Sequence, residues 1–510
     1  MNYYRFQITL LFLFAITALI VGAEIPQNLI IPPASTTETS LTICWDKPLN
    51  DSDTVGYEIY LNHRYIGYTK KTNYTVENLL PDNSYTIGVK SIDKMGNASS
   101  LLELPYVRTR KQGIILNILD YGAIGDGVYI NTAKIQQAIN DCPNGGTVYI
   151  PEGTFLSGAL FLKSNINLYI AKGGILQGSS SPKHYEPYLF NRFEGWEMET
   201  YSSLLNAGRM DRSGQYHAEN ISIRGKGVIQ GGGATLGNAM VSSKGMRSRG
   251  RLICLMNCRN VCIQGLTIQN SPCWTIHYIY SRDITLYDLT INSTVRNGDG
   301  IDPDSSINNY IFNCTFDTND DCIAIKSGKN PEGFYINKPS KKVYISYCSF
   351  IQGHGISIGS EMSGGVEDVI IRDCIAGHLK YGMQIKVTKE RGGYVKNVSV
   401  KDCDLQSIRI FTSVPYNNDG KPAPLSPYIQ NLSFINIDMT RAVRKDIITV
   451  EGFADKKCYS KKILFKNILL PEGAEIEVSN SSYICFDNVK FDDDIEPRYI
   501  VNRSSNIKIY

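Results

Sequence analysis

The sequence predicts an all-β protein in which a right-handed parallel β-helix follows a small β-sandwich. A strand-type motif recurs between residues 261 and 489, at intervals of 21 to 34 residues. The recurrences contain strands and no crossover helix, which is the signature of an all-β solenoid. Before about residue 110 the chain shows instead short alternating runs divided by turn residues, a pattern typical of a sandwich.

The first 23 residues predict an export signal. Arg5 gives a positive start, residues 8–21 form an almost unbroken apolar run, and Val21-Gly22-Ala23 offers small residues for cleavage after Ala23. An uncleaved membrane anchor is the alternative, but the run is short for a span, which needs about 20 residues. We therefore expect a secreted protein, periplasmic or extracellular, without stable membrane association.

Composition excludes some partners. The 510 residues are 42% hydrophobic and carry a net charge of +3, with no block of lysines and arginines. This length requires a long core or two domains, and the charge is too mild to indicate nucleic acid. A weakly basic protein can still favour a polyanionic substrate through a local groove. Because the exposed ends of a β-helix are usually capped, we expect a monomer.

Residues 24–110 predict the sandwich, with Trp45 as its core tryptophan. Leu80 to Tyr85 resembles the tyrosine corner of fibronectin type III domains, and the whole segment is similar to such a domain. The resemblance implies a spacer or a docking surface rather than a catalytic unit. The clearest alternating runs are residues 41–45, 56–60 and 85–89.

Residues 111–510 predict the β-helix. A short helix with Ile135 and Ile139 on its apolar side comes first, and strands at residues 147–150 and 166–170 follow. The repeats then align on one apolar position in each coil: Leu266, Leu289, Cys314, Cys348, Cys374, Cys403, Ile437, Ile468 and Val489.

Four of the 13 cysteines fall at this repeated position, namely Cys314, Cys348, Cys374 and Cys403. Parallel coils place equivalent side chains about 4.8 Å apart, so we expect these thiols to form an internal ladder. Packing as small apolar residues is the favoured interpretation, and disulfides between neighbouring coils are the alternative.

The candidate catalytic residues also recur at equivalent positions of successive coils. Ile301, Ile323, Ile356 and Met383 each open the next strand of a coil, and a polar residue stands two positions before each one. Stacked coils should bring these polar residues together on the outer surface, with Asp320 beside them. They are Asp299, Asp321, His354 and Tyr381.

Three carboxylates this close cannot all ionise without repulsion, so one of them should have a raised pKa. Glycoside hydrolysis needs such a pair: a protonated carboxyl for the leaving oxygen and a carboxylate that activates water or attacks directly. A calcium site and turn aspartates without a role are the alternatives from spacing alone.

Residues from about 115 to 495 resemble the polygalacturonases of glycoside hydrolase family 28. That family carries the motifs Asn-x-Asp, Asp-Asp, Gly-His-Gly and Arg-x-Lys. The first three stand here at Asn297 to Asp299, at Asp320 and Asp321, and at Gly353 to Gly355. The strings DGIDPDS, DDCIAIKSG and GHGISIGSEMSGG extend the similarity. The resemblance implies inverting hydrolysis of α-1,4-galacturonosyl bonds in pectin, with no cofactor and no metal.

The resemblance also implies roles for individual residues. Asp320 would be the general acid, while Asp299 and Asp321 would position and deprotonate the attacking water. His354 would tune one carboxylate, and Lys386 would bind the uronate carboxylate as a point charge. The alternatives are a structural histidine and a solvated strand lysine. Further substrate contacts are expected from Asn297, Tyr381, Lys326 and Gln384.

Gln384 departs from the family pattern, because the fourth motif usually begins with arginine. Glutamine cannot make a bidentate charged contact with a carboxylate. The substrate is therefore either plain polygalacturonate, with Lys326, Lys389 or Arg391 in compensation, or a modified or branched pectin such as rhamnogalacturonan or xylogalacturonan.

The sandwich domain and the first motif resemble the exo-acting branch of the family, in which loops close one end of the groove. Residues 185–215 and 231–251 are the expected closing loops, so we expect exo action. A pectate lyase, a pectin methylesterase and a non-catalytic polysaccharide-binding β-helix are the alternatives.

Overall fold

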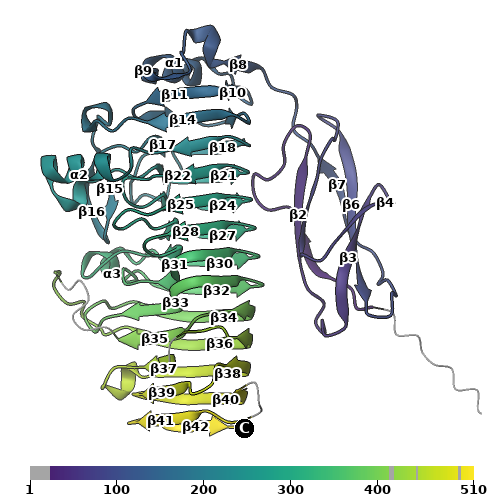
Figure 1. The fold of residues 1–510 in the computed structure, drawn as a ribbon, viewed down its shortest axis with the longest axis vertical. Helices are drawn as coiled ribbons and strands as arrows, with labels where there is room; N and C mark the ends of the chain where they lie inside the picture. Colours follow the sequence, from purple (N-terminus) through teal and green to yellow (C-terminus); the bar gives the residue numbers. More distant parts are fainter. Residues whose placement is uncertain (1–22, 413–418, 444–445, 492–494) are drawn as a thin grey trace, which may run out of the picture. The chain divides into compact units, whose positions relative to one another are not determined.

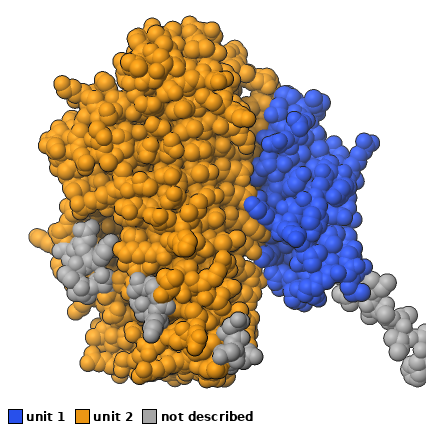
Figure 2. Space-filling model, in the orientation of Figure 1, with its two compact units in different colours: residues 1–31, 39–109 blue, residues 32–38, 110–510 orange. Residues whose placement is uncertain are grey.

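The computed structural model describes residues 23–412, 419–443, 446–491 and 495–510. The chain forms two compact units (Figure 2), the first with described residues 23–31 and 39–109, the second with residues 32–38 and the described residues from 110 onward. Residues 1–22, which hold almost all of the predicted export signal, lie outside the described residues. Within the described ranges, no helix is long and apolar enough to cross a membrane.

The first unit is an antiparallel sandwich with one three-stranded and one four-stranded sheet. Trp45 is buried and packs edge-on against Tyr57, with ring centroids 5.2 Å apart. The Tyr85 hydroxyl accepts a hydrogen bond from the Leu80 backbone N–H at 2.9 Å, as expected of a tyrosine corner. Its strands are β1 (Gln27–Ile30), β2 (Leu41–Asp46), β3 (Thr54–Leu61), β4 (Arg64–Thr69), β5 (Asn73–Val76), β6 (Ser84–Asp93) and β7 (Leu102–Arg108).

The second unit is a parallel β-helix whose coils stack from β8 to β42 (Figure 1). Each full coil contributes a strand to three columns, and together with the sandwich this confirms the predicted fold class. The first column comprises β8 (Ile115–Asn117), β10 (Thr147–Ile150), β13 (Ile166–Ile170), β18 (Ala218–Gly225), β21 (Cys258–Gln264), β24 (Arg282–Tyr287), β27 (Ile307–Phe312), β30 (Ser340–Ser346), β32 (Val366–Arg372), β34 (Tyr394–Asp404), β36 (Tyr428–Asp438), β38 (Ser460–Leu470), β40 (Ser481–Phe491) and β42 (Ser505–Ile509).

The second and third columns complete the coils, and long strands join them where a corner is straight. The second column comprises β9 (Asp126–Ile130), β11 (Gly153–Ser157), β14 (Gly174–Gly178), β19 (Val228–Gln230), β22 (Thr267–Gln269), β25 (Thr290–Ser293) and β28 (Thr315–Thr318). β31 (Ser349–Ile358) and β33 (Ile375–Val387) run through both columns. The third column adds β12 (Leu160–Leu162), β17 (Leu205–Gly208), β20 (Ile253–Met256), β23 (Ile276–Ile279), β26 (Ile301–Asp304), β29 (Ile323–Ile325), β35 (Ile408–Thr412), β37 (Asp446–Glu451), β39 (Glu475–Ser479) and β41 (Arg498–Asn502).

Side chains alternate between the interior and the surface along each strand, and the apolar ones fill the interior. Apolar residues at equivalent positions are register partners in successive coils and are buried, as with Leu286, Ile311 and Ile345. In the last coils Phe434, Phe465 and Phe486 stack, with ring centroids 5.1 and 4.9 Å apart. The column of coils thus supplies its own core, because each coil buries the apolar edge of its neighbour.

The turn before each repeated apolar position has a left-handed backbone. From Asp288 to Asn488 the residue at that turn has a φ between 51° and 55° in successive repeats. Asn and Asp tolerate this conformation better than other residues with side chains, which explains why they dominate the position. The turn side chains also bond between coils, since the Asn467 amide donates to Asn436 Oδ1 at 3.0 Å and the Asn488 amide donates to Asn467 Oδ1 at 2.9 Å.

The predicted cysteine ladder follows this turn. Cys314, Cys348, Cys374 and Cys403 are buried and free, so the described residues show apolar packing and not disulfides. Burial raises the pKa of the thiols of Cys348, Cys374 and Cys403 well above the usual value, which keeps them protonated.

Helices and a hairpin interrupt the coils. The predicted first helix is α1 (Thr132–Asp141), with Ile135 and Ile139 buried against the first coils. The segments expected to be closing loops contain the hairpin β15 (Leu189–Phe193) and β16 (Trp196–Thr200), and the helix α2 (Gly233–Lys244). The remaining helices are α3 (Glu332–Ile336) and the 3-10 turns η1 (Ile118–Tyr121), η2 (Pro182–His184), η3 (Met246–Ser248) and η4 (Lys456–Cys458).

Candidate active site

The candidate site lies on the corner between the second and third columns. Ile301 pairs with Ile323, Ile323 with Ile356, and Ile356 with Met383, which confirms the register predicted from the sequence. These inward-pointing residues, three isoleucines and a methionine, therefore fix the positions of the polar residues that stand two positions earlier in each coil.

Asp320, Asp321 and His354 lie together on this corner. His354 Nδ1 is 3.1 Å from Asp320 Oδ1 and 3.6 Å from Asp321 Oδ1. The Asp321 backbone N–H donates to Asp320 Oδ1 at 2.9 Å. Burial lowers the pKa of His354, but the hydrogen bonds that its imidazole donates to the two carboxylates outweigh this and raise the pKa to about 9. The imidazole is therefore a cation at neutral pH.

The glycines of the Gly-His-Gly motif make this approach possible. Gly353 and Gly355 have φ values of 129° and 84°, and a Cβ on Gly355 would lie 2.0 Å from the Gly382 carbonyl oxygen. Only glycine fits both the backbone conformation and the space, so the motif places the imidazole between them over the carboxylates of the preceding coil.

Asp321 is buried and held in its ionised form. Lys386 Nζ donates to Asp321 Oδ2 at 2.7 Å, and the Ser357 hydroxyl donates to Asp321 Oδ1 at the same distance. Lys386 and His354 lower the pKa of this carboxyl well below its usual range despite the burial. Lys386, expected to bind substrate, thus pairs with a site carboxylate.

The pKa of Asp299 is shifted in the opposite direction from that of Asp321. Burial, together with the nearby Asp302 and Asp320, raises its pKa well above the usual value. Burial also raises the pKa of Asp302 to about 7. Lys326 Nζ lies 3.5 Å from a carboxylate oxygen of Asp299, of Asp302 and of Glu361. The expected split in proton affinity is therefore present, with Asp299 and Asp321 at its two ends.

The other predicted contact residues surround this centre. Gln384 is buried, and its amide donates to the His354 carbonyl oxygen at 3.2 Å and to Ser357 Oγ at 3.4 Å. Tyr381 packs edge-on against His354, with ring centroids 5.3 Å apart. Asn297 Oδ1 accepts a hydrogen bond from Arg249 at 2.8 Å. Lys326 is enclosed by its three carboxylates rather than free for substrate.

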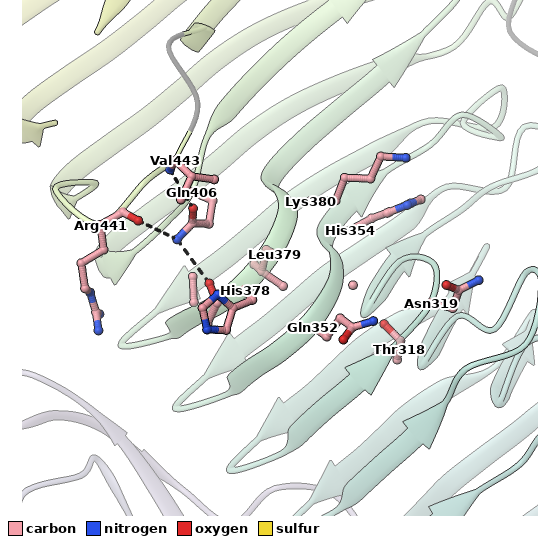
Figure 3. Close-up of a pocket in the computed structure, with 13 residues that line it drawn as sticks. Thr318, Asn319, Gln352, His354, His378, Leu379, Lys380, Gln406, Arg441 and Val443 are labelled. Carbon is pink, nitrogen blue, oxygen red and sulfur yellow. Dashed lines mark hydrogen bonds between the residues drawn. The ribbon is translucent and has the colours of Figure 1, made fainter. Parts of the chain in front are cut away.

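A cavity of about 640 Å³ opens beside His354 and continues toward the later coils (Figure 3). Among the residues that the structure describes, its lining includes His378, Lys380 and Arg441 but no Asp or Glu, and Arg441 pairs with Asp404 outside the lining. Gln406 holds its wall, since the amide donates to the carbonyl oxygens of Gly377 and Arg441 at 3.2 and 3.4 Å. A hollow with basic and without acidic groups favours an anionic ligand.

The predicted closing segments gather beside Asp299, away from this cavity. Trp274 stacks on Phe193 of β15 with centroids 4.8 Å apart, and Lys326 Nζ lies 4.6 Å from the centre of the Trp274 ring. Arg249 and Arg251 lie 5.3 and 4.7 Å from the centre of the Phe193 ring. The hairpin and the segment after α2 therefore support the first motif from one side.

The carboxylates and the histidine could also form a metal site by proximity, because one ligand atom each of Asp320, Asp321 and His354 lies within 4.8 Å of the others.

Fold and site together define a class of protein: a parallel β-helix with clustered carboxylates of unequal proton affinity beside a groove. Carboxylates in this arrangement serve the hydrolysis of glycosidic bonds.

Comparisons with known proteins agree. The model for glycosyl hydrolases family 28 matches residues 196–490, and the fibronectin type III model matches residues 24–102. An exo-poly-alpha-D-galacturonosidase of Dickeya chrysanthemi is 26% identical, with 93% of this chain and 92% of the relative covered. A probable polygalacturonase of Vitis vinifera is 31% identical over 58% of this chain and 61% of the relative.

Solved structures extend the likeness. A family 28 exopolygalacturonase of Yersinia enterocolitica is 25% identical with a TM-score of 0.87, covering 95% of this chain and 99% of the other. An exopolygalacturonase of Thermotoga maritima is 29% identical with a TM-score of 0.61, covering 76% and 91%. The chain belongs to glycosyl hydrolases family 28 and is a glycoside hydrolase.

Sequence reasoning missed three residues at the centre. Asp302 and Glu361 share Lys326 with Asp299, and Arg249 holds Asn297. The spacing Asp299-x-x-Asp302 is a signal that could have indicated a second carboxylate, because residues separated by the turn into β26 stay close. Arg249 and Glu361 come from irregular segments, which the repeat does not place.

Proposed function

We propose that this enzyme is a secreted galacturonidase that hydrolyses α-1,4-galacturonosyl bonds of pectin with inversion, and that it acts from a chain end. One observation carries the proposal: Asp320 and Asp321, with Asp299 near them, contact His354, and His354 lines a cavity that has basic and, among the described residues, no acidic lining residues. The names of the relatives support the substrate.

In the proposed mechanism Asp320 is the general acid. Its side chain is 27% exposed, against 3% for that of Asp321, so it is more open to the glycosidic oxygen. Asp321, kept ionised by Lys386, accepts a proton from water, and Asp299 helps to hold that water.

We propose His354 as a positioning residue and Tyr381, Lys386 and Asn297 as contributors to the substrate site. The cationic imidazole fixes Asp320 relative to Asp321. Closure on the Asp299 side by the hairpin and by Arg249 supports attack at a chain end. The cavity then takes the part of the chain on the other side of the scissile bond.

Product analysis on polygalacturonate tests the function. We expect monomeric galacturonate as the dominant product, full activity in the presence of a chelator, and no unsaturated, ultraviolet-absorbing product. Asp320→Asn should lose a factor of about 10² or more in kcat, while Asp317→Asn on the same coil keeps its rate. Chelator-sensitive formation of unsaturated products would establish a lyase instead, and mixed oligomers would establish endo action.

Gln384 favours a second candidate, a hydrolase of branched or modified pectin. The same assay with rhamnogalacturonan and xylogalacturonan decides between them, because the preferred substrate shows the higher kcat/KM. For the chain as a whole, we propose residues 24–110 as a separate domain and secretion through the N-terminal signal.

A further inference from the structure

Gln384 stands where the family pattern has an arginine, so a positive charge that would bind a substrate carboxylate is missing at this position. Its amide supports the His354 backbone and Ser357, so this side chain is engaged inside the site. A neutral amide also lacks the paired charged donors with which arginine binds a carboxylate.

The three cations that were expected to compensate for the missing arginine do not lie at the position of Gln384. Lys326 is buried among three carboxylates. Arg391 is fully buried, and its guanidinium donates to the Ser360 carbonyl oxygen at 2.7 Å and to Asn330 Oδ1 at 2.5 Å. Lys389 is exposed beyond the end of β33. None of the three stands in the register of Gln384.

Arg409 does stand in that register. It is the partner of Gln384 in the parallel pairing of β33 with β35, one coil further along, as Met383 is of Ile408. Neighbouring residues Ile408 and Ile410 point into the core and are fully buried, so Arg409 points outward on the same surface as Gln384.

Arg409 is held by two aromatic rings and is not paired with a described carboxylate. Its guanidinium carbon lies 5.3 Å from the centre of the Tyr381 ring and 5.0 Å from that of Phe411. Its Nε is buried without a hydrogen-bond partner, and within the part of the chain that the structure describes no carboxylate pairs with it. Aromatic contacts fix the guanidinium, and no described carboxylate competes with a ligand for it.

Tyr381 connects this arginine to the candidate active site, because the same ring packs against His354. We propose that Arg409 is a specificity-determining residue that binds a uronate carboxylate of the substrate, one coil beyond the position where the family pattern has its arginine. This inference rests on the proposed function and deepens it: the enzyme selects free uronate groups on the side of the scissile bond that faces the later coils.

Binding to a catalytically disabled variant tests the proposal. Calorimetry with a short oligogalacturonide compares Asp320→Asn with Asp320→Asn/Arg409→Gln. We expect affinity to fall about tenfold or more on loss of the guanidinium, since charge-assisted contacts to a carboxylate are strong. The fully methyl-esterified oligosaccharide should bind both variants alike, because it has no carboxylate to lose.

Further variants separate this role from a structural one. Arg409→Lys keeps the charge without the bidentate geometry and should restore only part of the affinity. Arg498→Gln, an exposed arginine at the start of β41, is the matched control and should change nothing. In the active enzyme Arg409→Gln should raise KM for polygalacturonate with little change in kcat, at an unchanged thermal midpoint.

The outcomes distinguish the two proposals. If Asp320→Asn binds neither oligosaccharide, the proposed substrate is wrong and this inference falls with it. If it binds the oligogalacturonide and the Arg409→Gln change has no effect, or weakens both ligands equally, the inference alone is overturned.

Discussion

At the scale of single residues, two aspartates one coil apart differ because of their neighbours. Asp321 has Lys386 at 2.7 Å and a cationic His354, so its pKa falls. Asp299 shares Lys326 at 3.5 Å with Asp302 and Glu361, so the cation is divided while burial acts in full, and its pKa rises. Burial and neighbouring carboxylates therefore favour a proton on Asp299, whereas Lys386 and His354 keep Asp321 ionised.

The pKa of His354 predicts a pH dependence. Because its folded-state pKa is raised to about 9, the ion pairs with Asp320 and Asp321 stabilise the fold fully below pH about 6.5 and weaken as the pH rises through about 9. We expect activity to fall with an apparent pKa near this value. In His354→Asn that alkaline limb should disappear, with a lower kcat at neutral pH.

Thermal unfolding provides the second measurement for His354. The difference in midpoint between wild type and His354→Asn should be largest near neutral pH and should shrink at a pH of about 10, where the imidazole is neutral. A difference that stays constant across this range would show that the histidine contributes packing and no charge.

At the scale of elements, the turn before each repeated apolar position decides the coil. A left-handed residue there turns the chain from the first column into the second, and its side chain bonds to the same turn of the next coil. Sequence, conformation and hydrogen bonding thus agree at one position, which is why Asn and Asp recur in it.

Two substitutions of Asn467 separate the contributions of this turn. Asn467→Gly removes both amide ladder bonds but tolerates the φ of 52°, whereas Asn467→Ala loses the bonds and also carries the left-handed strain. We expect Asn467→Ala to be less stable than Asn467→Gly by about 1–2 kcal/mol. Denaturant midpoints measure the difference, and Glu477→Ala on an exposed position of β39 is the control.

The repeat determines which elements could be predicted from the sequence. Strands at residues 147–150 and 166–170 and the register of Ile301, Ile323, Ile356 and Met383 follow from alternation and repeat. Arg409 was missed because the corner shortens: Met383 follows Cys374 by nine residues, whereas Ile408 follows Cys403 by five. The β15–β16 hairpin was missed because inserted segments obey no repeat.

At the scale of the whole molecule, a net charge of only +3 hides an uneven distribution. Asp320 and Asp321 contact His354, which lines the cavity, while His378, Lys380 and Arg441 also line it. A polyanion is therefore attracted to the groove rather than to the surface at large, and the charge that matters for binding is local.

This distribution predicts a dependence on ionic strength. The Debye length is about 10 Å at 0.1 M salt and about 3 Å at 1 M, so added salt screens the attraction between the cavity and uronate groups that approach it. We expect KM for polygalacturonate to rise several-fold over this range, with kcat nearly constant because the buried pairs at the carboxylates are screened little. Methyl-esterified pectin, which lacks most of the charge, should show a much weaker rise. An equal rise for both substrates would mean that salt acts on the enzyme and not on recognition of the uronate.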